Sequence, residues 1–355
     1  VNGVYPPDTD GDVGPDHYMQ MINLSFAIWD KNGNKLYGPV DNSTLWAGFV
    51  GSWTGTNDGD PVVLYDELAD RWIASQFAIN TPDGTYWELI AVSAGPDPLG
   101  SWYRYAFEFP AFNDYPKLGV WHDAYYATFN MFGSYTRAAV AAFEKDKMLI
   151  GDPDAQMVYF DVPGNFSMQP ADVDGPAPPA DAPCYFAHLD TYDTQQLEIY
   201  EFDVDWQNTG NSSLNQVASL AVQPFNADVG GIPQPGTGTR LDDLAVMLMY
   251  RFAYRNFGDY EVLLTNHTVK TNNKAGIRWY ELRKDSDEWY VYQQGTFAPD
   301  DDHRWMGSIA MNENGVIALG YTVSGNSTYP SVRYTGRSPE APLGEMNFQE
   351  MELVE

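Results

Sequence analysis

Short apolar runs, each closed by glycine, proline, asparagine or aspartate, follow one another along almost the whole chain. Runs such as 62–65, 72–77 and 87–92 are too short for most helices and are typical of strands. Aromatic residues, which favour strands, make up 15% of the 355 residues. The pattern therefore predicts an all-β fold, as a sandwich, a barrel or a propeller.

A motif rich in Asp, Pro or His precedes an apolar run repeatedly, at intervals of about 45–65 residues, which is the range of propeller blades. The motif occurs at 14–18, 58–61, 114–117, 182–185, 240–243 and 302–305. This spacing predicts a single β-propeller domain over residues 1–355, with six blades of four antiparallel strands. Five or seven blades also fit, because the fourth and fifth units are long. Residues 170–183 are rich in Pro, Ala and Asp, residues 230–238 are rich in Gly and Pro, and both segments are predicted to be exposed loops.

Acidic residues greatly outnumber basic ones. The chain has 49 Asp+Glu and 19 Lys+Arg, for a formal net charge of −30. Nucleic acids and anionic membrane surfaces both require concentrated Lys and Arg, so the sequence argues against both as partners. No apolar stretch approaches the roughly 20 residues of a membrane helix, and no membrane insertion is expected. The acidity suits a soluble protein in salty water, a calcium-binding protein, or both.

Two features bear on the cellular location. The only cysteine, Cys184, excludes an internal disulfide framework and a cysteine-based zinc site. The chain starts at Val1 rather than Met, which we interpret as a mature product whose export signal has been removed, so secretion is predicted. Six N-x-S/T sequons permit N-glycosylation. They lie at Asn23, Asn42, Asn165, Asn211, Asn266 and Asn326.

Longer stretches around the motifs carry a resemblance that covers nearly the whole chain. They lie at 10–18, 58–66, 115–121, 250–258, 303–311 and 331–337. These stretches resemble a largely uncharacterised family of secreted bacterial β-propeller proteins, and the resemblance implies an extracellular location but no activity. The architecture is also loosely similar to sialidases and propeller-type polysaccharide lyases, from which no catalytic residue carries over.

In a propeller, the repeated motifs would meet at the mouth of the central channel. We therefore expect an active-site pocket there, built from residues that are far apart in the chain. The candidate catalytic residues are His303, Arg304, His188, Arg240, Lys117, Tyr115, Asp60, Asp114 and Asp242. The structural alternative is a network of buried charges that cross-links the blades, since buried charges must be paired.

Two chemistries suit these residues, both acting on a polysaccharide or glycan. A glycoside hydrolase needs one protonated and one ionised carboxyl, for which Asp60, Asp114 and Asp242 are available. A polysaccharide lyase needs cations that neutralise a uronate, and a base. Arg240, Arg304 and Lys117 could supply the charge, and His303, His188 or Tyr115 the base. The lyase uses more of the candidates, and an acidic polysaccharide is the expected substrate.

A second group of cations lies within 33 residues of the chain: Arg251, Arg255, Arg278 and Arg283. An anionic ligand would explain this group. Ordinary salt bridges to the surplus of acidic residues are the structural alternative, and the one that we favour.

Calcium is the expected metal, in a structural role. Asp8, Asp10 and Asp12 alternate as in a calcium loop, but Met19 stands where an EF-hand requires Glu. Asp58 and Asp60 form a further cluster of oxygen ligands. The alternative to an enzyme is a non-catalytic propeller of the cell surface, with structural calcium and N-glycans. Such a protein would bind cell-surface or filament proteins.

Overall fold

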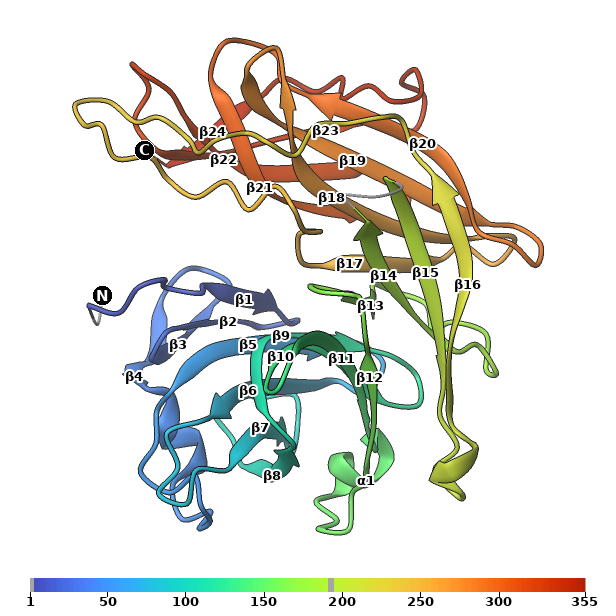
Figure 1. Cartoon of the computed structure of the whole chain (residues 1–355). Helices are drawn as coiled ribbons and strands as arrows, with labels where there is room; N and C mark the ends of the chain where they lie inside the picture. Colours follow the sequence, from blue (N-terminus) through green and yellow to red (C-terminus); the bar gives the residue numbers. More distant parts are fainter. Residues whose placement is uncertain (1–2, 191–194, 355) are drawn as a thin grey trace. The chain divides into compact units, whose positions relative to one another are not determined.

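The computed structural model describes residues 3–190 and 195–354 of the chain (Figure 1). The chain divides into two compact units. Unit 1 comprises Val1–Ser167 with Val204–Ser212, and unit 2 comprises Met168–Asp203 with Ser213–Glu355. Whether the two form one propeller domain over residues 1–355 stays a prediction. Within the described residues, 24 strands are accompanied by one α-helix and two short 3-10 helices, so the all-β prediction is confirmed.

Unit 1 contains three four-stranded antiparallel sheets, each a meander of consecutive strands. The first has β1 (Asp10–Val13), β2 (His17–Ile22), β3 (Ser25–Asp30) and β4 (Lys35–Asp41). The second has β5 (Gly59–Asp66), β6 (Arg71–Ala78), β7 (Tyr86–Ser93) and β8 (Trp102–Phe109). The third has β9 (Phe112–Val120), β10 (Tyr125–Phe132), β11 (Thr136–Phe143) and β12 (Met157–Val162). The helices η1 (Asn42–Trp46), α1 (Lys145–Ile150) and η2 (Thr209–Asn211) also belong to this unit.

Successive sheets of unit 1 pack face to face, as blades do. Alternate side chains of β2 and β3 point toward the second sheet, where Met19, Met21 and Phe26 bury against Val63 and Trp72. The first strands lie next to one another, β1 beside β5 and β5 beside β9 (Figure 1). This arrangement brings the starts of β5 and β9, where two of the repeated motifs lie, close to β1.

Unit 2 contains one eight-stranded sheet and one four-stranded sheet. The first half of the large sheet has β13 (Gln169–Val173), β14 (Cys184–Asp190), β15 (Gln196–Asp203) and β16 (Ser213–Ala221). Its second half has β17 (Phe252–Asn256), β18 (Glu261–Thr271), β19 (Lys274–Lys284) and β20 (Tyr290–Phe297). The smaller sheet has β21 (His303–Met311), β22 (Ile317–Ser324), β23 (Ser331–Arg337) and β24 (Met351–Val354).

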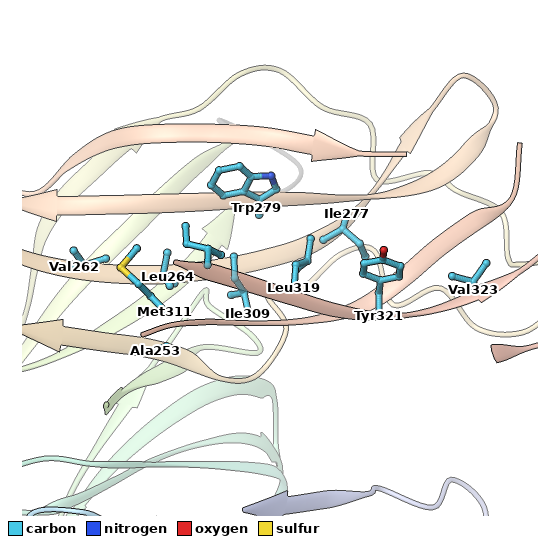
Figure 2. Close-up of a cluster of buried hydrophobic side chains, with 11 residues drawn as sticks. Ala253, Val262, Leu264, Ile277, Trp279, Ile309, Met311, Leu319, Tyr321 and Val323 are labelled. Atoms are coloured by element: carbon cyan, nitrogen blue, oxygen red, sulfur yellow. The ribbon is translucent and has the colours of Figure 1, made fainter. Parts of the chain in front are cut away.

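The core of unit 2 lies between β17–β19 and the smaller sheet. Figure 2 shows it as a row of side chains between the two layers, with Trp279 on one side and Leu319 and Tyr321 on the other. The turn from β21 to β22 is the Asn/Gly turn that the sequence predicts: Asn312 Oδ1 accepts the backbone N–H groups of Asn314 and Val316, and Gly315 has a φ of 75°.

The prediction of four-stranded antiparallel blades is confirmed for four sheets, but six separate blades are not observed. The remaining eight strands form one sheet, because β13 and β17 pair in parallel through their backbones instead of packing face to face. Two local predictions fail here. Residues 169–173, expected in part as an exposed loop, form the buried strand β13. The apolar run after the motif at 240–243 was expected to be a strand, but residues 222–251 contain none.

No helix of residues 3–190 and 195–354 is both long enough and apolar enough to cross a membrane.

Candidate functional site

Two of the repeated motifs form irregular backbone in unit 1. Asp60 lies in a bulge of β5 and has a φ of 43°. Tyr115 of β9 has a φ of 54°, where the register with β10 shifts. Residues with a Cβ rarely adopt such positive φ angles, and bulges and strained residues of this kind concentrate beside functional sites.

Asn23, which follows β2, connects this bulge to the segment before β1. Its side-chain Nδ2 donates to Asp8 Oδ2 at 2.5 Å, and its Oδ1 accepts the backbone N–H of Asp60 at 2.7 Å. Asp8 itself has a φ of 38°. Asn23 is 7% exposed, so these bonds are made in a largely dry environment, and they fix the carboxyl group of Asp8 and the backbone of Asp60.

Lys117 of β9 lies among these acidic residues. Its Nζ lies 3.8 Å from the centroid of the Tyr115 ring and donates to the backbone oxygen of Pro116 at 2.9 Å. Burial lowers the pKa of Lys117, and the charges of nearby acidic residues oppose that change. We call Lys117 and the groups around it the Lys117 cluster: Asp8, Asp10, Asp60, Asp114, Tyr115 and Lys117.

Two carboxyl groups of the cluster, those of Asp60 and Asp114, have raised pKa values. Burial, and then the charge of Asp8, raise the pKa of Asp60 to about 7, while Lys117 acts in the opposite direction. Burial also raises the pKa of Asp114, against a hydrogen bond from the backbone of Tyr115 and the charge of Lys117. Asp60, Asp114 and Lys117 are each partly exposed and therefore remain within reach of solvent.

The polar region continues inward through Glu88 of β7. Glu88 is fully buried and accepts a hydrogen bond from Asn113 Nδ2 at 3.0 Å. Burial raises the pKa of Glu88 well above its usual value, and the charge of Asp60 acts in the same direction. Neither Glu88 Oε1 nor Asn113 Oδ1 has a hydrogen-bond partner among the described residues. Such unpaired buried atoms are costly.

The predicted site residues of unit 2 have other surroundings. Arg304 is fully buried, with Asp300 and Glu350 each binding its guanidinium through two oxygens, at 2.7–2.9 Å. Glu350 also accepts the hydroxyl of Tyr321 and a bond from Arg333. This is the pattern of the structural alternative, in which a buried charge is fully paired.

The remaining candidates of unit 2 are dispersed. His303 Nδ1 accepts the backbone N–H of Ala275, and burial, followed by the charge of Arg240, lowers its pKa. Arg240 is exposed and donates to the backbone oxygen of Gly231, and Asp242 is exposed at the next turn. His188 lies on β14, with Nδ1 3.0 Å from Glu198.

Three of the five predicted calcium ligands already bind backbone N–H groups. Asp10 and Asp12 lie on β1 rather than in a loop, and their Oδ2 atoms accept from Val63 and Tyr65 of β5. Asp58 accepts from Ile79 and Asn80. Asp8 and Asp60 belong to the Lys117 cluster. Within the described ranges, no three Asp, Glu, His or Cys residues are grouped as a metal site. Calcium stays a prediction.

Sequence reasoning missed Asn23, Glu88 and Asn113. Glu88 had a detectable signal, because it is the only charged residue within the apolar run 87–92. Asn113 directly precedes a motif residue. Asn23 drew attention only as a sequon, and nothing in its local sequence indicates that it bridges Asp8 and Asp60.

Comparison with known proteins finds similarity in architecture alone. No protein-family model matches the chain, and no curated protein matches it. Among solved structures, a thermostable family-43 glycoside hydrolase is 9% identical, with 97% of this chain and 96% of that chain covered and a TM-score of 0.38. A PL25 ulvan lyase bound to -[GlcA(1-4)Rha3S]- is 12% identical, with 99% and 92% covered and a TM-score of 0.39.

An α-L-arabinanase of Penicillium chrysogenum complexed with arabinobiose is 9% identical, with 95% of each chain covered and a TM-score of 0.44. These values identify neither a family nor an activity for this chain.

Proposed function

We propose that this chain is a secreted carbohydrate-active enzyme that hydrolyses glycosidic bonds, with the Lys117 cluster as its active site. The observation that carries the proposal is Asp60, a partly exposed carboxyl in strained backbone whose pKa is raised to about 7. Glycoside hydrolysis needs one carboxyl that is protonated near neutral pH and a second that is ionised. Asp60 and Asp114 would supply these two carboxyls from within one cluster.

The roles follow from the charges. Asp60 donates its proton to the glycosidic oxygen as the bond from that oxygen to the anomeric carbon breaks. Asp114 accepts a proton from a water molecule, whose oxygen bonds to the anomeric carbon. The charge of Lys117 favours the ionised form of Asp114, against the effect of burial. Exchange with solvent returns both carboxyls to their starting states, and the product carries a new reducing end.

A second candidate is elimination from an acidic polysaccharide. It is favoured by the contact between Lys117 Nζ and the Tyr115 ring, at 3.8 Å from the ring centroid. In this reaction Lys117 would neutralise a uronate carboxylate, and Tyr115 in its ionised form would take the proton from the adjacent carbon. The leaving glycosidic oxygen would depart with the electrons of its bond to the sugar and take that proton from Tyr115, giving an unsaturated uronate and a free hydroxyl. Arg304 is not needed, because its guanidinium already binds two carboxylates.

The test is incubation of the full chain with a panel of neutral and uronate-containing polysaccharides, with reducing ends and ultraviolet absorbance followed together. Reducing ends without absorbance support hydrolysis, whereas a parallel rise supports elimination. We expect Asp60→Asn to lower the hydrolytic rate at least about 100-fold, the contribution of a general acid. The matched control is Asp16→Asn, an exposed acid outside the cluster, which should retain the rate.

The pH profile is a second readout. Hydrolysis should decline as the pH rises through about 7, because Asp60 then loses the proton that it donates. Full activity of a folded Asp60→Asn variant would overturn this assignment.

The non-catalytic alternative, a surface propeller with calcium and N-glycans, is supported if no polysaccharide of the panel is cleaved. Its calcium is tested by melting. If the ion is bound at Asp8 and its neighbours, EDTA lowers Tm, and Asp8→Asn removes the difference. An unchanged Tm contradicts the calcium prediction.

A further inference from the structure

A pocket of about 250 Å3 lies in unit 2, outside the Lys117 cluster. Its lining comes from four places: the turn between β17 and β18, strands β19 and β20, the turn between β21 and β22, and the end of β23. Sites that enclose drug-sized ligands have volumes of about 300–1,000 Å3. The smaller volume here suits one sugar ring or one compact anion.

Four planar groups form a continuous stack along this pocket. The rings of Phe257 and Tyr260 lie 5.0 Å apart and nearly parallel. The guanidinium carbon of Arg283 lies 4.5 Å from the Tyr260 ring centroid and 3.4 Å from that of Tyr292. The Arg283 guanidinium thus packs against two aromatic rings, and its N–H groups remain the means by which it makes polar contacts.

The position of Tyr292 depends on a defect in the sheet. Glu281 pairs with Gln293 and Leu282 pairs with Val291, so Tyr292 is the extra residue of a bulge in β20. Bulges re-aim side chains and are often found next to functional sites. The bulge interrupts the regular alternation of side chains in β20, and Tyr292 lies over Arg283 at this interruption.

One of the three guanidinium nitrogens of Arg283 makes a hydrogen bond. Its Nε donates to Glu281 at 2.6 Å, and Nη1 and Nη2 make no hydrogen bond within the described part of the chain. Arg337 also lines the pocket, and it donates only to backbone oxygens, those of Ala341, Pro342 and Glu345. The pocket lining thus contains two guanidinium groups and two carboxyl groups, those of the buried Glu281 and the exposed Glu313.

We propose that this pocket binds the anionic group, a carboxylate or a sulfate, of one acidic sugar residue. Arginine binds both groups through paired N–H donors, and Nη1 and Nη2 of Arg283 are available for such a pair. The inference rests on the proposed function in one respect, that the anion belongs to a polysaccharide. An anionic ligand was one explanation for the group of four arginines at 251–283 in the sequence, and this inference assigns that ligand to Arg283.

The other three arginines of that cluster have different surroundings. Arg251 contacts Asp172 at 3.4 Å, Arg255 donates to the backbone of Met311, and Arg278 donates to Thr296. The net charge of −30 repels an anionic polymer at long range, but the Debye length is only about 8 Å at physiological salt. Contacts within the pocket persist there, so binding should not require low salt.

Calorimetric titration of the full chain with monosaccharides tests the pocket apart from the enzyme activity, because monosaccharides contain no bond to hydrolyse. We expect glucuronate or glucose 6-sulfate to bind at least tenfold more tightly than glucose, and the tighter of the two identifies the anion. Arg283→Gln should weaken this binding at least tenfold. The matched control is Arg333→Gln on β23, whose partners are Glu350 and Glu352, and it should leave binding unchanged.

A second variant keeps the test decisive if Arg283→Gln does not fold. Glu313 is exposed in a turn, so Glu313→Gln should fold normally and should tighten binding severalfold by removing a repelling charge at the rim. Equal binding of glucose and the two anions would overturn the proposal. So would unchanged anion binding in a folded Arg283→Gln variant or in Glu313→Gln.

Discussion

Asp60 and Arg304 both lie at the starts of first strands, in motifs that look alike in the sequence, but their neighbours give them opposite properties. Burial, and then the charge of Asp8, disfavour the charge of Asp60 and raise its pKa. Arg304 is enclosed by carboxylates, and these favour its charge and raise its pKa. A buried charge with full pairing is structural, whereas an acid whose pKa is raised to about 7 can exchange protons at physiological pH.

The raised pKa of Asp60 makes a prediction about stability. The folded state holds this proton up to about pH 7, while the unfolded state loses it near 3.8. Between these values the folded state binds more protons, so stability falls as the pH rises and is constant above that window. Asp60→Asn removes this loss. We therefore expect the Tm of Asp60→Asn to exceed that of the native chain by more at pH 8 than at pH 5, measured by calorimetry.

The same comparison with Asp16→Asn serves as the control and should show no change in the difference between the two pH values. A constant difference for Asp60→Asn would contradict the raised pKa.

Substitution of Arg304 should lower stability, in contrast to Asp60→Asn. Arg304→Met leaves Glu350 and Asp300 without their cation, and breaking a buried pair in this way costs about 3–5 kcal/mol. Asp300 is 52% exposed, so we expect the lower end of that range, measured as the free energy of unfolding in urea. Arg333→Gln, which alters a partly exposed pair on the same Glu350, should cost about 1 kcal/mol or less. Equal losses would argue against the special role of burial.

At the scale of elements, three first strands share one irregularity. The bulges of β5, β9 and β21 contain Asp60, Tyr115 and Met306, and each of these residues has a positive φ. The repeated motif of the sequence therefore corresponds to a repeated backbone defect rather than to a repeated catalytic group. In β5 and β9 the defect places polar side chains in the Lys117 cluster. In β21 it is followed by Gly307, which crosses closely over β18.

The close approach of β21 to β18 at Gly307 leaves no room for a side chain there. A Cβ at this position would collide with the side chain of Asn266, which is fully buried and has little freedom to move. We expect Gly307→Ala to cost about 1–3 kcal/mol, as overpacking does, measured by urea unfolding. Gly320→Ala in β22 is the matched control, because the nearest atom to its Cβ would be 4.0 Å away. If both variants lose the same stability, the close approach at Gly307 does not matter.

At the scale of the whole molecule, folding separates the six sequons into groups. Asn42 and Asn266 are fully buried and Asn23 is 7% exposed. Asn211 and Asn326 are exposed, and Asn165 is partly exposed. A glycan is bulky and hydrated, so it fits only on the surface of a folded chain.

We therefore expect glycans at Asn211 and Asn326, and none at Asn23, Asn42 or Asn266, in folded protein secreted from a eukaryotic host. Mass spectrometry of the peptides after enzymatic deglycosylation identifies the occupied sites. A glycan on Asn42 or Asn266 in folded, monodisperse protein would contradict the packing described around them.

The candidate site was predictable in part. The recurring motif grouped Asp60, Asp114, Tyr115 and Lys117, which the structure places in one cluster, because motifs at the starts of neighbouring first strands lie close together. The motif also grouped Arg304 with these residues. The partner of Arg304 is Glu350, which is 46 residues further along the chain. No local pattern predicts so distant a pairing. Asn23 was missed for the same reason.

The sequence by itself determined the strands and most of their turns. Alternation of side chains and turn residues such as Asn312–Gly315 act over a few residues, so they can be recognised locally. Only the tertiary structure decided that β13 pairs with β17, whose partner residues are 81 positions apart in the chain, and which charges are buried beside which partners. The physical reason is that backbone periodicity is a property of neighbours in the chain. Sheet pairing and pKa depend instead on groups that only folding brings together.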